Sequence, residues 1–251
     1  MTTHTDDATI VLIPGHWLGA WAWDDVVEHL TTLGRRALPM TLPGLDATDP
    51  ARASRTLDDQ AAAIEGVIAQ AAAADGAPVV IVAHSGANAP VSLVLDRHPE
   101  RVRRVVWVDS GPVAPESGSA ADASEAMDEL PLPPFETLGA QASLEGLSAE
   151  VLERFRTRAV PEPGPVLRQP VELSNDARRR VPTTLVCCSI SSAQVRELAD
   201  AGHPMFAEVT RLEAVDFVDL PTGHWPMWSL PGDLAGIIAA AAASPTQDSN
   251  R

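Results

Sequence analysis

The sequence predicts an α/β fold, in which a mostly parallel sheet is flanked by helices and carries a helical insertion. Short apolar runs alternate with longer amphipathic segments, as expected where each buried strand is followed by a helix that packs on the sheet. The length of 251 residues suits one large domain of this class. Each apolar run is therefore expected to be a strand of one central sheet.

The first part of the chain follows this alternation closely. A buried apolar run ends at Pro14-Gly15, and Thr56 with Asp59 forms the pattern of a capping box at the start of a helix. The predicted strands are residues 10–13, 36–42, 79–83 and 104–108. The predicted helices are residues 23–33, 56–74 and 87–97.

The alternation is interrupted between residues 110 and 182, where prolines cluster. We interpret this segment, 110–182, as a cap that lies over the sheet, with helices at 138–147 and 149–158. Residues 1–109 and 183–251 then form the core domain. Its second part contains predicted strands at 183–189 and 215–220 and predicted helices at 193–201 and 232–243.

Charge and hydropathy narrow the range of partners to a small-molecule substrate. The net charge of −16 disfavours both nucleic acid and an anionic membrane surface. No stretch reaches the roughly 18 uninterrupted apolar residues of a membrane span. Residues 1–9 lack the pattern of a secretory signal, so we expect a cytoplasmic protein. Nothing in the sequence indicates an oligomeric state.

Missing residue types exclude several kinds of chemistry. All 18 basic residues are arginine, so there is no lysine for a Schiff base, a pyridoxal phosphate anchor or a Walker A loop. The absence of tyrosine excludes a Tyr–Lys reductase pair. Cys187 and Cys188 stand in an apolar run, as buried thiols do, and no histidines have metal-ligand spacing. We therefore expect neither a cofactor nor a metal.

Ser85 is the candidate nucleophile, because it lies where the buried run 79–83 turns into a helix. The small residues Ala83 and Ala87 stand two positions on either side, as the tight turn of a nucleophile elbow requires. Such a turn directs the helix N-terminus and the Gly86 N–H at a developing oxyanion. A serine with only a structural role would produce the same local pattern.

His224 is the candidate general base. It stands in the segment Gly223-His224-Trp225, in the loop after the last predicted strand. Imidazole is the side chain that most often accepts the proton of a serine nucleophile. A loop histidine without a chemical role is the alternative.

The chain resembles the α/β-hydrolase superfamily, and most closely its plant methylesterase and hydroxynitrile-lyase branch. The resemblance rests on the run 14–23, which reads PGHWLGAWAW, on Pro43-Gly44, and on the run 223–227, which reads GHWPM. It implies an α/β-hydrolase fold without a cofactor. It also implies that Ser85 and His224 are catalytic, with the backbone N–H groups of His16 and Gly86 as the oxyanion hole.

The carboxylate of a Ser–His–Asp triad does not carry over from the resemblance. The family normally places it just after the strand that ends here at Cys187-Cys188, but the chain continues with Ser189-Ile190-Ser191. Asp109, at the end of the neighbouring strand 104–108, is the best substitute. If Asp109 only caps its own turn, the site is a Ser–His dyad or uses another group.

The resemblance implies hydrolysis of a small hydrophobic carboxylic ester, or a related acyl or lactone compound, through an acyl-enzyme. Large apolar side chains on the loops expected around the pocket suggest a hydrophobic substrate, although ordinary core packing would explain them equally well. These are Trp17, Trp21, Phe135, Trp225, Met227 and Trp228.

Three other functions are compatible with this scaffold. A hydroxynitrile lyase needs a lysine after the histidine, where this chain has Trp225. A cofactor-free dioxygenase uses a His–Asp base and would use Asp109, but such enzymes tend to carry histidine where this chain has Gly86. A non-catalytic small-molecule binding protein is the third alternative.

Overall fold

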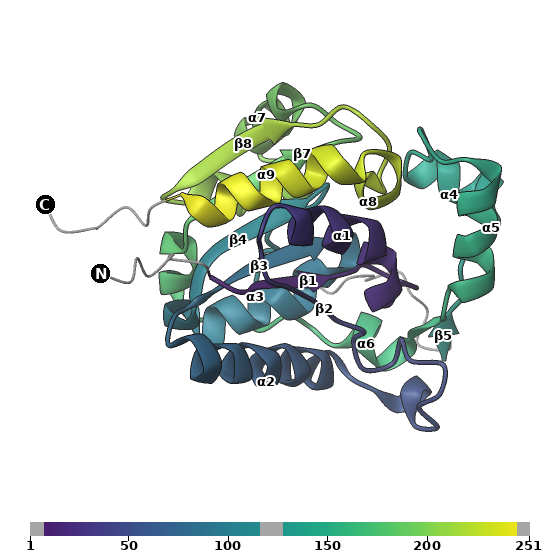
Figure 1. The fold of residues 1–251 in the computed structure, drawn as a ribbon, viewed down its shortest axis with the longest axis horizontal. Coiled ribbons are helices and arrows are strands. Elements are labelled where there is room, and N and C mark those ends of the chain that lie inside the picture. The colour runs from purple at the N-terminus through teal and green to yellow at the C-terminus, as the bar shows by residue number, and fades with distance from the viewer. Residues whose placement is uncertain (1–7, 116–127, 245–251) are drawn as a thin grey trace, which may run out of the picture.

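The central sheet has six parallel strands, and a computed structural model describes it together with the rest of residues 8–115 and 128–244. The strand order is β2-β1-β3-β4-β7-β8, with β3 and β4 in the middle (Figure 1). The strands are β1 (Ile10–Ile13), β2 (Ala37–Pro39), β3 (Val79–His84), β4 (Val102–Val108), β7 (Thr183–Cys187) and β8 (Val215–Asp219). All neighbouring strands run in the same direction, so their carboxyl ends share one edge.

Helices cover both faces of this sheet. On one face α1 (Asp24–Thr32) and α9 (Pro231–Ala243) lie in front of the strands in Figure 1. On the other face lie α2 (Leu57–Asp75), α3 (Asn88–Arg97) and α7 (Ser192–Asp200). Side chains of β3 alternate between the two apolar cores, which explains why this strand is a continuous β-branched run.

The helix starts follow the local sequence. The Thr56 side chain accepts the Asp59 N–H while the Asp59 carboxylate accepts the Thr56 N–H, so the predicted capping box is confirmed. Shorter helical segments join the main elements. They are η1 (Ala20–Trp23), η2 (Arg52–Ser54), η3 (Ser85–Ala87), η4 (Pro99–Arg101), η5 (Asp176–Arg180), η6 (Pro204–Phe206), η7 (Val209–Arg211) and α8 (Pro226–Ser229).

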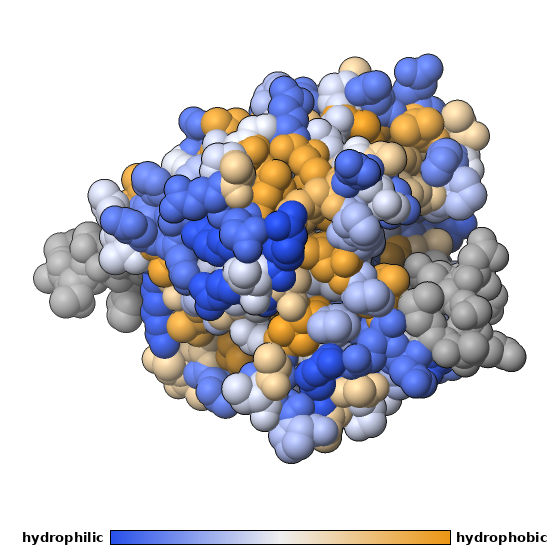
Figure 2. Space-filling view, turned by 90° about the vertical axis from the view of Figure 1, so that its right-hand side faces the viewer, coloured by the Kyte–Doolittle hydropathy of each residue, from blue (hydrophilic) through white to orange (hydrophobic). Residues whose placement is uncertain are grey.

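The segment between β4 and β7 contributes no strand to the main sheet in its described residues, 109–115 and 128–182. It contains α4 (Phe135–Gln141), α5 (Ala149–Arg158), α6 (Gly164–Arg168) and a small two-stranded antiparallel sheet of β5 (Glu129–Leu130) and β6 (Glu162–Pro163). On the side of the molecule that carries α4 and α5, apolar residues gather near the centre and hydrophilic residues surround them (Figure 2).

One predicted helix in this segment was misplaced. The helix expected at 138–147 is α4, which begins at Phe135 and ends at Gln141. It starts early because the Pro134 carbonyl accepts the N–H groups of Thr137 and Leu138, which makes the first turn. It ends early because Ala142 is extended.

The α/β class with a mostly parallel sheet is confirmed. Within the described ranges, no helix combines the length and apolar character needed to cross a membrane. The same ranges contain no group of three or more histidine, cysteine, aspartate or glutamate side chains arranged to hold a metal ion.

Candidate active site

Ser85 follows β3 directly and occupies a strained turn at the carboxyl edge of the sheet. Its φ of +50° lies in the left-handed region, which residues other than glycine seldom adopt. The loop after β1 passes so close that a Cβ at Gly15 would lie 2.8 Å from the Cβ of Ser85. The Ser110 hydroxyl donates to the Ser85 carbonyl at 2.9 Å. These contacts fix the backbone that presents the Ser85 hydroxyl.

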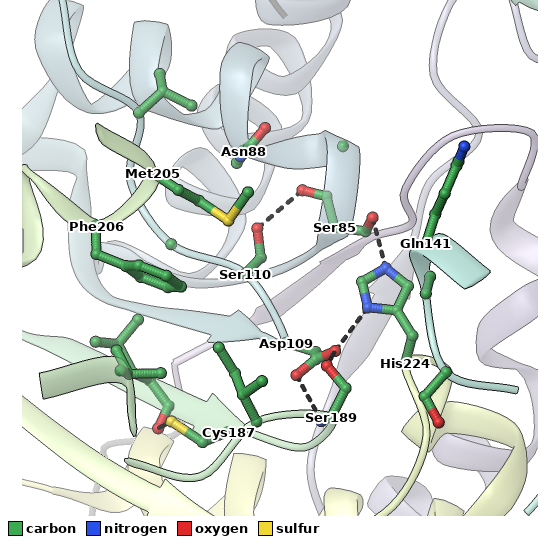
Figure 3. Close-up of a pocket in the computed structure, with 18 of the residues that line it drawn as sticks. Ser85, Asn88, Asp109, Ser110, Gln141, Cys187, Ser189, Met205, Phe206 and His224 are labelled. Atoms are coloured by element: carbon green, nitrogen blue, oxygen red, sulfur yellow. Dashed lines mark hydrogen bonds and ion pairs between the residues drawn. The ribbon is translucent and has the colours of Figure 1, made fainter. Parts of the chain in front are cut away.

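His224 lies between β8 and α8, and its ring connects Ser85 with a carboxylate (Figure 3). Its Nε2 lies 2.8 Å from Ser85 Oγ, and its Nδ1 lies 2.6 Å from Asp109 Oδ2. The His224 N–H donates to the Ser143 carbonyl at 2.7 Å, and the His224 carbonyl accepts from Nε2 of His84 at 2.8 Å. Both backbone groups are therefore held, and with them the ring.

Asp109 is the first residue after β4 and reaches the site across the end of β7. Its Oδ1 accepts the backbone N–H groups of Cys188 and Ser189 at 3.0 and 2.9 Å. Its Oδ2 accepts the Ser189 hydroxyl at 2.6 Å. Burial raises the pKa of Asp109, but hydrogen bonds from His224 and Ser189 outweigh this, so the pKa lies below its ordinary value. Asp109 is therefore a carboxylate that accepts the Nδ1 proton of His224.

His84 stands directly before the serine and was not singled out from the sequence. It is buried, and burial together with the nearby His224 lowers its pKa from 6.5 to about 3. The ring is therefore neutral, with its proton on Nε2, where it donates to the His224 carbonyl. His84 supports the histidine loop from beneath the nucleophile turn.

A cavity of about 880 Å³ opens beside Ser85 and His224. Near the two side chains it is polar, with Asn88, Ser110 and Gln141 in its lining (Figure 3). The lining also has an apolar part, which includes Val171, Leu185, Val195, Met205, Phe206 and Val209. No arginine of the described ranges lines the cavity.

His16 and Gly86, the residues expected to form the oxyanion hole, also line this cavity. The two are in contact, because a Cβ built on Gly86 would overlap the His16 ring. The structure thus brings Ser85, His224, Asp109, His16 and Gly86 to one place, although they come from four separate strand ends.

The sequence profile of the Alpha/beta hydrolase family matches residues 10–237. The chain belongs to the α/β-hydrolase family. Its relatives indicate an enzyme of the carboxylic ester hydrolase kind. A probable hydrolase, R7, from Phoma sp. is 27% identical over 242 residues, which cover 93% of this chain and 97% of the relative. A carbendazim hydrolyzing esterase from Nocardioides sp. is 27% identical over 250 residues, which cover 93% of this chain and 99% of the relative.

The fold of this α/β-hydrolase is shared with a plant methylesterase. The crystal structure of the methylesterase MES16 from Arabidopsis superimposes with a TM-score of 0.71 at 17% identity, covering 94% of this chain and 99% of the other. At this level of identity the similarity shows that the two proteins share a fold.

The six large apolar residues suggested as substrate contacts do not line the cavity of this α/β-hydrolase. The helical turn of α8 directs Trp225, Met227 and Trp228 into the core beneath α1 and α9. Trp21 stacks on Trp228, and Phe135 packs on Phe155. Trp17 donates its Nε1–H to the Leu130 carbonyl. The prediction that these side chains build the pocket is therefore wrong, and they pack in the core instead.

The apolar wall of the cavity comes instead from segments that the sequence did not single out. Met205 and Phe206 belong to η6, after α7, and line the cavity (Figure 3). Met205 is 71% exposed, which is unusual for a large apolar side chain. The one signal in the sequence is the apolar pair Met205-Phe206 directly after Pro204, in an otherwise polar loop.

Proposed function

We propose that this α/β-hydrolase is a serine hydrolase that cleaves a hydrophobic carboxylic ester, or a related acyl or lactone compound, through an acyl-enzyme. The observation that carries the proposal is the unbroken hydrogen-bonded line from Ser85 through His224 to Asp109, open to a cavity. A nucleophile and base within hydrogen-bond reach, with a third group that orients the base, is the arrangement that activates a serine.

In the proposed reaction, Nε2 of His224 removes the Ser85 proton as Oγ attacks the substrate carbonyl. Asp109 keeps the other ring proton on Nδ1 and stabilises the imidazolium that forms. The backbone N–H groups of His16 and Gly86 stabilise the oxyanion, each by about 3 kcal/mol. His224 then protonates the leaving alcohol, and a water molecule repeats the sequence on the acyl-enzyme.

The cavity favours an uncharged substrate with a bulky apolar group. Its volume of about 880 Å³ lies within the usual range for small-molecule sites. Its charged lining residues are Asp109 and Glu145, both acidic, so an anionic substrate would meet no compensating arginine in the described part of the wall. The relative named a carbendazim hydrolyzing esterase supports hydrolysis of an ester as the reaction.

We also propose that residues 110–182 act as the cap that shapes this cavity. Three parts of the segment, residues 110–114, residues 139–145 and Val171, line the cavity that contains Ser85 and His224. Exchanging side chains there is expected to change which esters are cleaved, because these residues lie against the bound substrate.

A fluorophosphonate probe and a series of p-nitrophenyl esters test the proposal. We expect covalent labelling of Ser85, located by mass spectrometry, and release of p-nitrophenol that rises from acetate to longer acyl chains. The Ser85→Ala variant is the matched control and should neither label nor turn over. An unlabelled wild-type protein without esterase activity would contradict the proposal and favour a binding protein.

A cofactor-free dioxygenase remains the second candidate, because Asp109 follows β4 and contacts His224 as the base of such an enzyme would. Oxygen uptake with an aromatic hydroxy-ketone distinguishes the two. Uptake by wild type that persists in Ser85→Ala would favour the dioxygenase, since only the hydrolase needs the serine hydroxyl as nucleophile.

A further inference from the structure

The His16 ring is fixed by a buried carboxylate from another part of the chain. Its Nδ1 lies 3.0 Å from Oε2 of Glu162, which is 2% exposed and belongs to β6. The other oxygen, Oε1, accepts Nε2 of Gln60 at 3.1 Å, and the same amide donates to the Pro43 carbonyl at 3.1 Å. A buried carboxylate is stable only with such partners, so Glu162 is committed to the His16 ring and to Gln60.

The opposite side of the same ring rests on the nucleophile turn. A Cβ at Gly86 would meet all three of Nε2, Cδ2 and Cε1 of His16 at distances that no real Cβ adopts. The residue after the nucleophile therefore has no side chain, and the imidazole of His16 fills that space. His16 and Gly86 are sterically coupled through this contact.

The backbone next to His16 is held by residues in or near the small sheet of β5 and β6. The Trp17 carbonyl accepts the Val160 N–H at 3.0 Å, and the Trp17 ring N–H donates to the Leu130 carbonyl at 3.0 Å. Trp17 has a φ of +66°, a conformation that costs a residue of this size about 1 kcal/mol or more. Including the bond between His16 and Glu162, three hydrogen bonds to the segment 130–162 thus hold the loop at His16 and Trp17 in this conformation.

We propose that His16 is a positioning residue. Its side chain sets the distance between the backbone N–H of His16 and the backbone N–H of Gly86. The inference rests on the proposed function, in which these two N–H groups stabilise the oxyanion. Donors of this kind act only within a narrow range of distances from the oxyanion, and a displacement of about 1 Å costs roughly a hundredfold in rate. Glu162 thereby links the segment between β4 and β7 to the reacting centre.

The first test compares two glutamates on the two strands of this small sheet. Glu162→Ala releases the His16 ring, whereas Glu129→Ala breaks the ion pair of β5 with Arg52, at 2.6 Å, and leaves His16 untouched. We expect Glu162→Ala to lower kcat roughly 10- to 100-fold with KM nearly unchanged, and to weaken a trifluoromethyl ketone inhibitor by the same factor. Glu129→Ala should leave kcat within about twofold of wild type.

Glu162→Gln is expected to restore most of the activity, because an amide can hydrogen-bond both the His16 ring and Gln60. Equal losses in Glu162→Ala and Glu129→Ala, or a change in KM alone, would overturn the proposal and leave the sheet of β5 and β6 with a merely structural role. Thermal melting of each variant shows whether the fold is retained.

The second test uses the steric coupling and does not depend on Glu162. Gly86→Ala forces the His16 ring away, so we expect kcat to fall about a hundredfold. In the double variant His16→Ala/Gly86→Ala the clash is removed, and kcat should rise at least fivefold above that of Gly86→Ala. Losses that simply multiply in the double variant would refute the coupling.

The two proposals fail in different ways. If wild type does not react with the fluorophosphonate probe, the serine hydrolase proposal fails. If wild type reacts and turns over but the Glu162 and Gly86 variants behave otherwise than stated, only the role of the His16 side chain is wrong.

Discussion

Two of the buried charged groups in the described part of this α/β-hydrolase make an instructive pair, because one borders the large cavity and the other does not. The first is Asp109 with His224 at the carboxyl edge of the sheet. The second, here called the arginine cluster, consists of Arg178, Arg179 and Glu208. Glu208 accepts from Arg178 at 3.2 Å and from Arg179 at 3.1 Å, and its side chain is only 3% exposed.

The surroundings of the two groups differ more than their chemistry. Asp109 and the neighbouring Ser85 both have a positive φ and border about 880 Å³ of open space. The space beside the arginine cluster measures about 10 Å³, no more than one water molecule requires. A buried charge therefore indicates chemistry here only where a strained backbone presents it to a space that a substrate can enter.

The largest expected effect is at the nucleophile and the base. Ser85→Ala and His224→Ala should each lower kcat by about 10⁶-fold, because either change removes the activated hydroxyl. Ester hydrolysis assays measure the rate. Thermal melting should give an unchanged melting temperature, which shows that the fold is retained. Substantial turnover by Ser85→Ala would show that Asp109 and His224 do not act by activating this serine.

Asp109→Asn is expected to lower kcat by about 10⁴-fold. Asparagine tolerates the φ of +45°, so the backbone is retained. Its amide N–H₂ would face Nδ1 of His224, which leaves the ring proton on Nε2 and prevents that atom from accepting the Ser85 proton. Wild-type kcat in this variant would show that Asp109 only holds the loop in place.

Glu208→Ala should lower the stability of the fold and leave kcat unchanged, which is the opposite of what is expected for the triad variants. Removing this carboxylate leaves Arg178 and Arg179 buried without their main partner, which costs about 3 kcal/mol of unfolding free energy. Urea denaturation measures this loss, while kcat below the unfolding transition should match wild type. A large fall in kcat of the folded variant would show that the arginine cluster also contributes to catalysis, contrary to the comparison.

The smallest expected effect is that of His84→Gln on how the free energy of unfolding depends on pH. The folded-state pKa of His84 is about 3 and the unfolded value is 6.5, so below pH 6.5 the unfolded chain binds a proton that the folded protein does not. Unfolding free energy should therefore fall as pH decreases, by about 2 to 3 kcal/mol on reaching pH ~4.5. Glutamine keeps a donor to the His224 carbonyl but does not titrate, so this part of the slope should disappear in urea titrations.

Local signals predicted the fold and the residues at the strand ends. The apolar run of β3 and the capping box at Thr56 are encoded within a few neighbouring residues, and both were predicted correctly. The proximity of Asp109 to Ser85 followed from the rule that adjacent parallel strands end side by side.

Contacts between distant segments were not predictable from the same signals. The loops around His224 suggested a pocket of tryptophans, but the helical turn at Pro226 directs Trp225 and Trp228 into the core. Glu162 reaches His16 across 146 positions, and no periodicity connects them. Such pairs are set by how the segment between β4 and β7 folds back over the strand ends.

The socket that receives the Asp109 carboxylate is built from main-chain N–H groups that directly follow a different strand, β7. Because the N–H groups of Cys188 and Ser189 bind an oxygen whichever residue supplies it, the acid and its receptor are separable parts. In a designed chain, the same socket offers a place to graft an acid from β7 itself.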